Sequence, residues 1–340
     1  MTTLFVRLRR ALVLVPAVLV LTTSPAGADA ARPGNVRSSV RSIEPPTSAL
    51  SASIRGGDAF LQIVVAPGHD VVVYDYDDPP HQYLRVGKDG MVEENHNSKA
   101  FYQNRSRYNT EPPATLVDGA PPDWHRVSGT GVAQWHDHRV HWMARTTPPP
   151  TDWEVPLLVD GVATRITGHY QPVRAPSSAP WLAMSLVLAG ALVVVARPRP
   201  AIAAAVVGAA AALALPVAVA EGHVAGQGSA AYSLAALPAA GVVAAVLALV
   251  VARFGSPLRP PPLVGALVAG AGAAVALWAL RRVAVLRSAV LVTDVSPTLD
   301  RASVAIGLGI GLGAVVVGVL ATGIISARPA SRPPSRTSVR

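Results

Sequence analysis

The stretch APSSAPWLAMSLVLAGALVVVARPRP, residues 175–200, divides the chain into two parts that suit different solvents. Before it the sequence is polar and mixed, and after it apolar runs follow one another almost to the C-terminus. The chain of 340 residues is 51% hydrophobic and only 14% charged, which is too apolar for an ordinary soluble domain. We therefore expect a polar N-terminal domain followed by an all-α transmembrane bundle at 180–327.

The bundle is expected to contain about five helices, because five apolar runs are long enough, or nearly so, to cross a bilayer. These runs are 181–196, 201–220, 229–252, 263–280 and 303–327. Their apolar cores hold no Asp, Glu, Lys, Arg or His, the side chains that transport sites usually need. The bundle is therefore interpreted as an anchor and assembly unit rather than as a transporter.

Arginines indicate the orientation of the bundle. With the polar domain outside, most loop arginines and the basic tail 328–340 lie in the cytoplasm, as the positive-inside rule requires. Four arginines in the outer segment 281–302 are the exception, and apolar residues at helical spacing suggest that this segment lies along the membrane interface. The sequence predicts a multi-pass cell-membrane protein with an extracytoplasmic N-terminal domain and a cytoplasmic C-terminus.

The N-terminus, residues 1–30, has the order of a secretory signal peptide. Three arginines precede an apolar run at 11–21, and small residues that suit cleavage follow. That run is too short to span a bilayer comfortably, so we expect export with cleavage. The chain contains no cysteine, which excludes disulfides, a lipoprotein anchor and thiolate metal sites.

The exported part is expected to be a linker at 31–46 followed by an all-β, Ig-like sandwich at 47–179. The linker is rich in Arg, Ser and Pro, whereas turn residues separate short β-like runs in the domain. Asp160-Gly161 between two such runs predicts a two-residue hairpin. The runs are ALSASIR, AFLQIVV, DVVVYDY, QYLRV, WHRVSG, VHWMAR, WEVPLLVD and VATRITGHY. The segment 98–109 breaks the pattern and is expected to be a loop or a short helix.

The segment QWHDHRVHWM, residues 134–143, is the strongest candidate for a metal site. If 135–142 is a strand, His136 and His138 point to the same face and can chelate one ion, while His141 falls on the other face. Imidazole, carboxylate and thioether ligands would suit copper or zinc in the absence of thiolates. His141 and Met143 are expected to assist, and the full set of candidates for a third ligand is His125, His141, Met143, His81, His96 and His69.

A structural interpretation of the same segment stands beside the metal site. Flanking tryptophans suggest a buried strand, in which Asp137 and Arg139 lie on one face and bind each other. In that case the cluster is a scaffold network and no metal binds. The sequence leaves both interpretations open.

Other functions find less support in the sequence. Residues 31–179 hold 14 Arg and Lys against 16 Asp and Glu, so no basic patch for nucleic acid is expected. No nucleophile stands at a recognisable elbow, and we expect no enzymatic activity. Asp75, Asp77 and Asp78 lack the spacing of a calcium loop and are expected to form a solvated acidic turn.

The expected partners are the lipid bilayer and a membrane protein. The last apolar run carries two overlapping GxxxG patterns, which allow close helix contact within the bundle, self-association or contact with another membrane protein. The glycines concerned are Gly307, Gly309, Gly311 and Gly313.

The order of three segments followed by five spans resembles a family of uncharacterised actinobacterial membrane proteins. The segments are YLRVGKDGMVEENHNSKAFYQNR (83–105), PPDWHRV (121–127) and a WHDHRxHWM-type motif (135–143). This resemblance implies a cell-envelope location and a β-rich outer module, and it brings no activity. A looser likeness to the copper-resistance proteins CopC and CopD implies a β-sandwich joined to a membrane bundle. The N-terminal histidine of CopC and intramembrane ligands are absent here, so copper transport does not follow.

Together these features predict a cell-envelope membrane protein whose outer β-domain is a binding module for copper or zinc. The alternative is a structural or assembly component of a membrane complex, in which the His and Trp cluster is scaffold.

Overall fold

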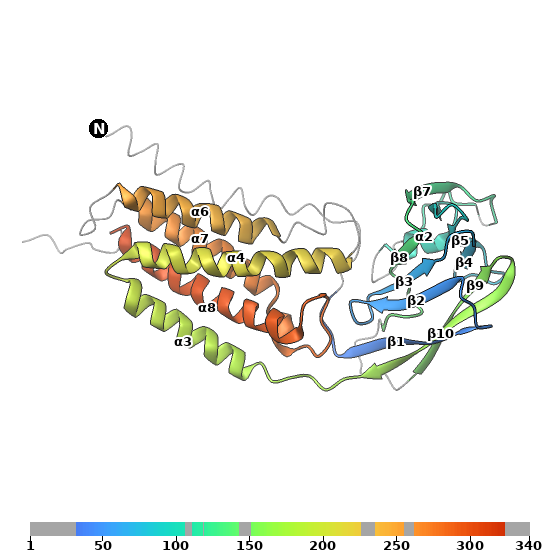
Figure 1. Cartoon of the computed structure of the whole chain (residues 1–340), viewed down its shortest axis with the longest axis horizontal. Helices are drawn as coiled ribbons and strands as arrows, with labels where there is room; N and C mark the ends of the chain where they lie inside the picture. Colours follow the sequence, from blue (N-terminus) through green and yellow to red (C-terminus); the bar gives the residue numbers. More distant parts are fainter. Residues whose placement is uncertain are drawn as a thin grey trace, which may run out of the picture.

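The computed structural model describes residues 32–105, 111–117, 119–142, 151–225, 235–254 and 262–323. An N-terminal β-domain lies at one end of an elongated bundle of helices (Figure 1). The expected signal peptide at 1–30, the tail at 328–340 and Met143 lie outside the described residues. The division into a β-rich part and a helical part agrees with the sequence.

The β-domain contains two antiparallel sheets that share one core. One sheet has seven strands in the order β1-β10-β9-β4-β5-β6-β7, and the other has three in the order β2-β3-β8. This unequal division does not confirm the expected Ig-like arrangement. The elements are β1 (Val36–Glu44), β2 (Leu50–Arg55), β3 (Phe60–Val65), β4 (Val71–Tyr74), β5 (Gln82–Val86), β6 (Val92–Asn95), α2 (Lys99–Gln103), β7 (Trp124–Ser128), β8 (Val132–Trp135), β9 (Thr151–Val159) and β10 (Val162–Pro172).

Alternating side chains explain why the longest strands form. In β10 the side chains of Thr164, Ile166 and Tyr170 are buried, while their neighbours along the strand are exposed or half-buried. β9 and β10 are joined by the predicted hairpin, in which Asp160 has φ 48° and Gly161 has φ 78°. Both positive φ values are those of a two-residue hairpin turn, so this turn fixes the register of the two strands.

Part of the expected linker is a strand. β1 lies within 31–46 and pairs with β10 at the edge of the large sheet. Its few apolar side chains, Val36, Val40 and Ile43, pack against the core. The linker prediction was wrong here because a strand that exposes one face needs few apolar residues, and Ser and Arg occupy the other positions.

The helical part contains five apolar helices long enough to cross a membrane, which supports a membrane protein. Within the described residues, the central helix α8 packs against α7, α3 and α4. The helices are α3 (Ala179–Ala196), α4 (Pro200–Ala225), α6 (Ala236–Arg253), α7 (Pro262–Arg281) and α8 (Pro297–Ala321), with a short 3₁₀ helix η2 (Val283–Arg287). α8 begins earlier than the predicted 303, because Ser296 caps it by accepting from the Leu299 N–H at 3.3 Å.

The glycines of α8 are used within the chain. A Cβ on Gly311 would lie 2.7 Å from the backbone nitrogen of Ala276 in α7. Gly309 lies against the backbone of Ser185 in α3, and Gly313 would meet the Ala189 carbonyl oxygen at 3.0 Å. These glycines let α3 and α7 approach α8 closely. The face expected to serve self-association is therefore already covered inside the bundle.

The β-domain is joined to the bundle through the segment that precedes α8. Gly34 and Val290 exchange two backbone hydrogen bonds of 3.0 Å. A guanidinium nitrogen of Arg55 lies 2.7 Å from a carboxylate oxygen of Asp294. The segment 281–302 was expected to lie along the membrane interface. Part of it pairs with the β-domain, where its backbone finds hydrogen-bond partners, and its position along the interface stays a prediction.

Candidate metal centre

The histidine motif is a strand end followed by a turn. β8 ends at Trp135, and the N–H of Val140 donates to the Asp137 carbonyl at 3.1 Å. The turn brings the His141 ring to a centroid distance of 4.7 Å from the His136 ring, and the His138 ring lies 5.2 Å from His136. The prediction of one strand over 135–142 was wrong beyond its first residue. His141 joins His136 because strand alternation stops there.

The turn between β2 and β3 orients two of these rings. Nδ1 of His136 donates to the carbonyl oxygen of Ala59 at 2.8 Å, and Nδ1 of His141 donates to that of Asp58 at 3.0 Å. Because a carbonyl oxygen only accepts, Nδ1 carries a hydrogen in each ring, and in the neutral form of either ring the lone pair is on Nε2. Both Nε2 atoms are buried and have no hydrogen-bond partner in the described part of the chain. A carbonyl on Nδ1 is a usual partner of a histidine that binds metal through Nε2.

The spacing of His136 from His141, and of His136 from His138, is compatible with an ion shared by each pair. Two imidazoles bound through nitrogen at about 2.1 Å, with a metal angle of roughly 90 to 110°, place their ring centroids about 4.5 to 5.3 Å apart. The two observed centroid distances, 4.7 and 5.2 Å, lie within this range. His138 is half-buried, and its ring stacks on Tyr76 at 6.0 Å. His138 can therefore move toward the two buried rings more easily than they can move toward it.

The turn between β2 and β3, which orients two of these rings, also contacts the helical bundle. A Cβ on Gly56 would lie 3.2 Å from the side chain of Val224 in α4, and Gly57 lies against Val290. The side-chain amide of Gln134, next to the motif, also donates to the Val224 carbonyl at 2.7 Å. The three histidines therefore lie at the junction of the β-domain and the membrane bundle.

Burial controls the protonation of His136. Burial, and then the neighbouring imidazoles of His141 and His138, lower the pKa of His136 from 6.5 to about 4. The ring is therefore neutral near pH 7. Its Nε2 lone pair is available for an ion without prior loss of a proton.

Acid is expected to destabilise the β-domain through His136. Its folded-state pKa of about 4 lies below the unfolded value of 6.5, so the unfolded chain binds a proton first as the pH falls. Stability is complete above pH 6.5 and falls by about 3 kcal/mol toward pH 4. Urea unfolding of the detergent-solubilised chain, with a chelator present, measures this fall. A His136→Gln variant should lose less stability, and an identical pH profile would contradict the assignment.

A separate buried network of the motif is formed by Trp135, Asp137 and Arg139. The carboxylate of Asp137 is fully buried and accepts from Trp135 Nε1 at 2.8 Å and from Arg139 Nε at 2.9 Å and NH2 at 2.7 Å. Arg139 NH2 also donates to the Tyr74 carbonyl at 3.0 Å. The predicted pair of Asp137 and Arg139 is present. The motif thus contains a structural network and, beside it, a cluster of imidazoles.

Two groups in the described part of the chain bring three ligand atoms within 4.8 Å of one another, and the three histidines of the motif are not one of them. In the first, Asp75, Asp77 and His81, the carboxylates are already engaged. Asp75 Oδ1 accepts from the His81 N–H at 2.8 Å, and Asp77 pairs with the Lys99 ammonium at 2.9 Å. Asp75 is buried, so the expected solvated acidic turn was wrong for this residue. A cation here would have to displace Lys99.

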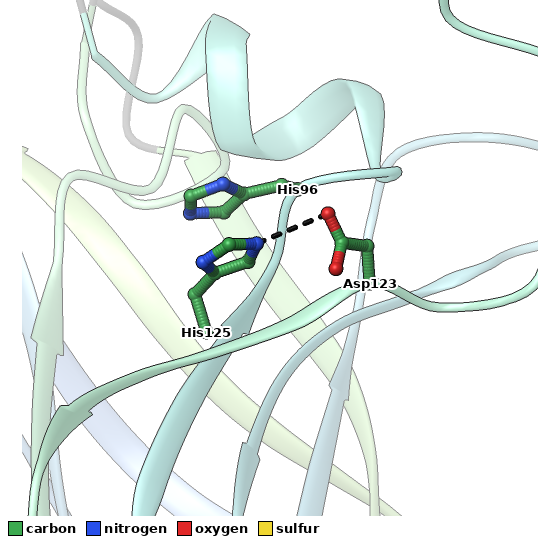
Figure 2. A group of neighbouring side chains, drawn as sticks. All are labelled: His96, Asp123 and His125. Atoms are coloured by element: carbon green, nitrogen blue, oxygen red, sulfur yellow. Dashed lines mark hydrogen bonds and ion pairs between the residues drawn. The ribbon is translucent and has the colours of Figure 1, made fainter.

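The second group is His96, Asp123 and His125 (Figure 2). His96 and His125 were candidates for a third ligand to the motif, but the structure places them with each other and with Asp123. Burial, and then the neighbouring charges of His125 and Arg105, lower the pKa of His96 below its ordinary value. No strand was predicted at β6, so the proximity of these residues could not be predicted from the sequence.

Comparisons with protein-family models, with curated proteins and with solved structures find no match to this chain.

Proposed function

We propose that the β-domain of this membrane protein binds one transition-metal ion through His136, His138 and His141. The main support is the pair of buried Nε2 atoms of His136 and His141, which lack hydrogen-bond partners among the described residues while both Nδ1 atoms are bonded. Each buried polar atom left unpaired costs about 1 to 3 kcal/mol. An ion bound to both nitrogens would remove this cost.

Zinc and copper(II) are the ions that suit this donor set. Both bind neutral imidazole well, and three imidazoles leave a further position for water or for the thioether of Met143. No thiolate competes, because the chain has no cysteine. The depressed pKa of His136 favours the neutral ring that either ion requires.

The proposed orientation places the β-domain outside the cell and the C-terminus in the cytoplasm. Two of the four outward arginines of 281–302 oppose it less, because they are engaged at that end of the bundle. Arg282 is buried between Glu221 and Asp300, and Arg301 NH2 donates to the Ser288 carbonyl at 2.7 Å. Such bound charges contribute less to topology than arginines in free loops.

The bundle is proposed to anchor the metal-binding domain and not to conduct the ion. In the described parts of the five helices, the ionisable side chains lie near helix ends. Glu221 and His223 are near the end of α4, and Asp300 and Arg301 are near the start of α8. A conducting path would need ligands deeper in the membrane.

Metal titration of the purified full chain in detergent tests the proposal. A His136→Ala/His141→Ala variant is expected to bind zinc at this site at least about 100-fold more weakly, since it loses two of three ligands. The matched control is His69→Ala/His169→Ala, which removes two other histidines of the β-domain. His69 pairs with Asp160 and His169 pairs with Asp152, so neither belongs to the cluster of imidazoles. The control should keep the parent affinity.

An equal affinity in the parent and in the His136→Ala/His141→Ala variant would refute the site. So would a parent that binds neither zinc nor copper(II). The motif would then be scaffold, as in the structural interpretation, and the variant would show only a lower unfolding temperature.

A further inference from the structure

A second set of metal-binding side chains lies where β6 meets β7 (Figure 2). In the register of this pair, Asn95 faces Trp124. The N–H of His96 donates to the Asp123 carbonyl at 2.9 Å, one position further along. Because side chains alternate along each strand, His96, Asp123 and His125 project from the same face.

Asn95 holds this arrangement from the inside of the sheet. Its side chain is 2% exposed, and its Oδ1 accepts from the N–H groups of Asp123 and Asn97, both at 2.9 Å. Its Nδ2 donates to the Gln82 carbonyl at 2.7 Å. The buried side chain of Asn95 therefore fixes the backbone at Asp123 and around His96. A site held in this way needs little ordering when an ion arrives.

The rings of the group are stacked. The His96 ring lies between Phe101, at a centroid distance of 3.8 Å, and His125, at 3.7 Å with an interplanar angle of 8°. Two charged imidazoles at this spacing would repel each other, and after burial the charge of His125 is the next cause of the lowered pKa of His96. Asp123 Oδ2 lies 3.0 Å from His125 Nε2 and supplies the negative charge.

We propose that His96, His125 and Asp123 form a second metal site, open to solvent, for zinc or copper(II). Two imidazoles and one carboxylate are an established ligand set for such ions and leave positions for water or for an external ligand. The side chains of His125 and Asp123 are 50% and 56% exposed, so an ion reaches them without any opening of the fold.

Binding requires one local movement. The lone pairs of two nearly parallel rings, with centroids 3.7 Å apart, lie in two nearly parallel planes and cannot both point at one ion. His125 must therefore turn about its Cβ–Cγ bond, and its half-exposed position leaves it room to do so. The His96 ring keeps its stacking contact with the Phe101 ring. The carboxylate of Asp77 pairs with Lys99, whereas among the described residues the ion-pair partner of Asp123 is His125 alone.

The test is zinc stoichiometry by equilibrium dialysis of the full chain in detergent. If both proposed sites exist, the parent binds two ions. The His96→Ala/His125→Ala variant binds one, the His136→Ala/His141→Ala variant binds one, and the chain with all four changes binds none. Asp123→Asn keeps the volume of the side chain and removes its charge, and it should weaken the exposed site by about tenfold or more. Copper(II) electron paramagnetic resonance of the His136→Ala/His141→Ala variant should show two nitrogen ligands.

The outcomes separate this inference from the proposed function. A single ion that is lost only in the His96→Ala/His125→Ala variant would support the exposed site and refute the buried one. A single ion that is lost only in the His136→Ala/His141→Ala variant would overturn the inference. Unchanged zinc binding in the His96→Ala/His125→Ala variant, with its circular dichroism unaltered, would overturn it as well. The His69→Ala/His169→Ala control should bind as the parent does.

Discussion

Replacement of Asp137 by alanine is expected to lower the free energy of unfolding of the β-domain by about 3 to 5 kcal/mol. The Asp137 carboxylate is fully buried and accepts four hydrogen bonds of 2.7–2.9 Å from Trp135 and Arg139. The guanidinium of Arg139 lies 4.7 Å from the centre of the Tyr76 ring. Without Asp137, the largely buried guanidinium of Arg139 keeps, among the described residues, only backbone carbonyl acceptors, and the buried indole N–H of Trp135 loses its acceptor.

Urea unfolding of the detergent-solubilised chain, followed by tryptophan fluorescence, measures this loss. An exposed pair provides the control: Arg41 and Asp152 lie 3.0 Å apart with side chains 56% and 66% exposed, so Asp152→Ala should leave stability nearly unchanged. Burial opposes the charge of Asp137, but Arg139 holds the pKa of that carboxyl below its ordinary value. Its contribution is therefore present at neutral pH and lost only in acid. Equal effects of the two alanine variants would show that the buried network is not what holds the motif.

Replacement of Gly272 by valine is expected to separate α7 from α8 and to lower the stability of the bundle by about 3 kcal/mol or more. A Cβ on Gly272 would lie 2.6 Å from the Gly311 carbonyl oxygen and 2.8 Å from the Val315 nitrogen. Both are backbone atoms of α8. They cannot move away as a flexible side chain would, so the helices must part and lose the contacts between them.

Gly270 provides a matched control in the same helix, since a Cβ there meets nothing within 4 Å. Gly270→Val should unfold like the parent, whereas Gly272→Val should unfold at a lower denaturing-detergent fraction, measured by loss of helical circular dichroism in mixed micelles. Indistinguishable curves for the two variants would contradict the close packing of α7 on α8. The same comparison tests whether the glycines of α8 serve contacts inside one chain.

The apolar helices could be located from hydropathy along the chain. A helix in a bilayer satisfies its own backbone hydrogen bonds and covers itself with apolar side chains, so each span carries its signal within its own residues. The predicted 263–280 and 181–196 nearly coincide with α7 and α3. The Asp160–Gly161 hairpin could also be predicted from the sequence. The positive φ angles of its turn favour particular residues at two adjacent positions.

Strands with few apolar residues were harder to predict. β1 was taken for a linker and β6 was missed, because a strand is stabilised by its neighbours in the sheet as much as by its own side chains. Sequence alternation also could not show that β8 ends at Trp135. The assignment of His141 to the opposite face failed for that reason.

The composition of the chain and its local patterns thus determined which helices are long and apolar enough to cross a membrane, and which histidines are close in sequence. Only the tertiary structure decided which imidazoles meet. His136 and His141 are oriented by carbonyl oxygens of Ala59 and Asp58, which lie 77 and 83 residues away along the chain. His96 and His125 meet through the register of two strands. A hydrophobic pattern is a property of one segment, whereas a ligand cluster depends on how separate segments pair, and that pairing is set by the folded core.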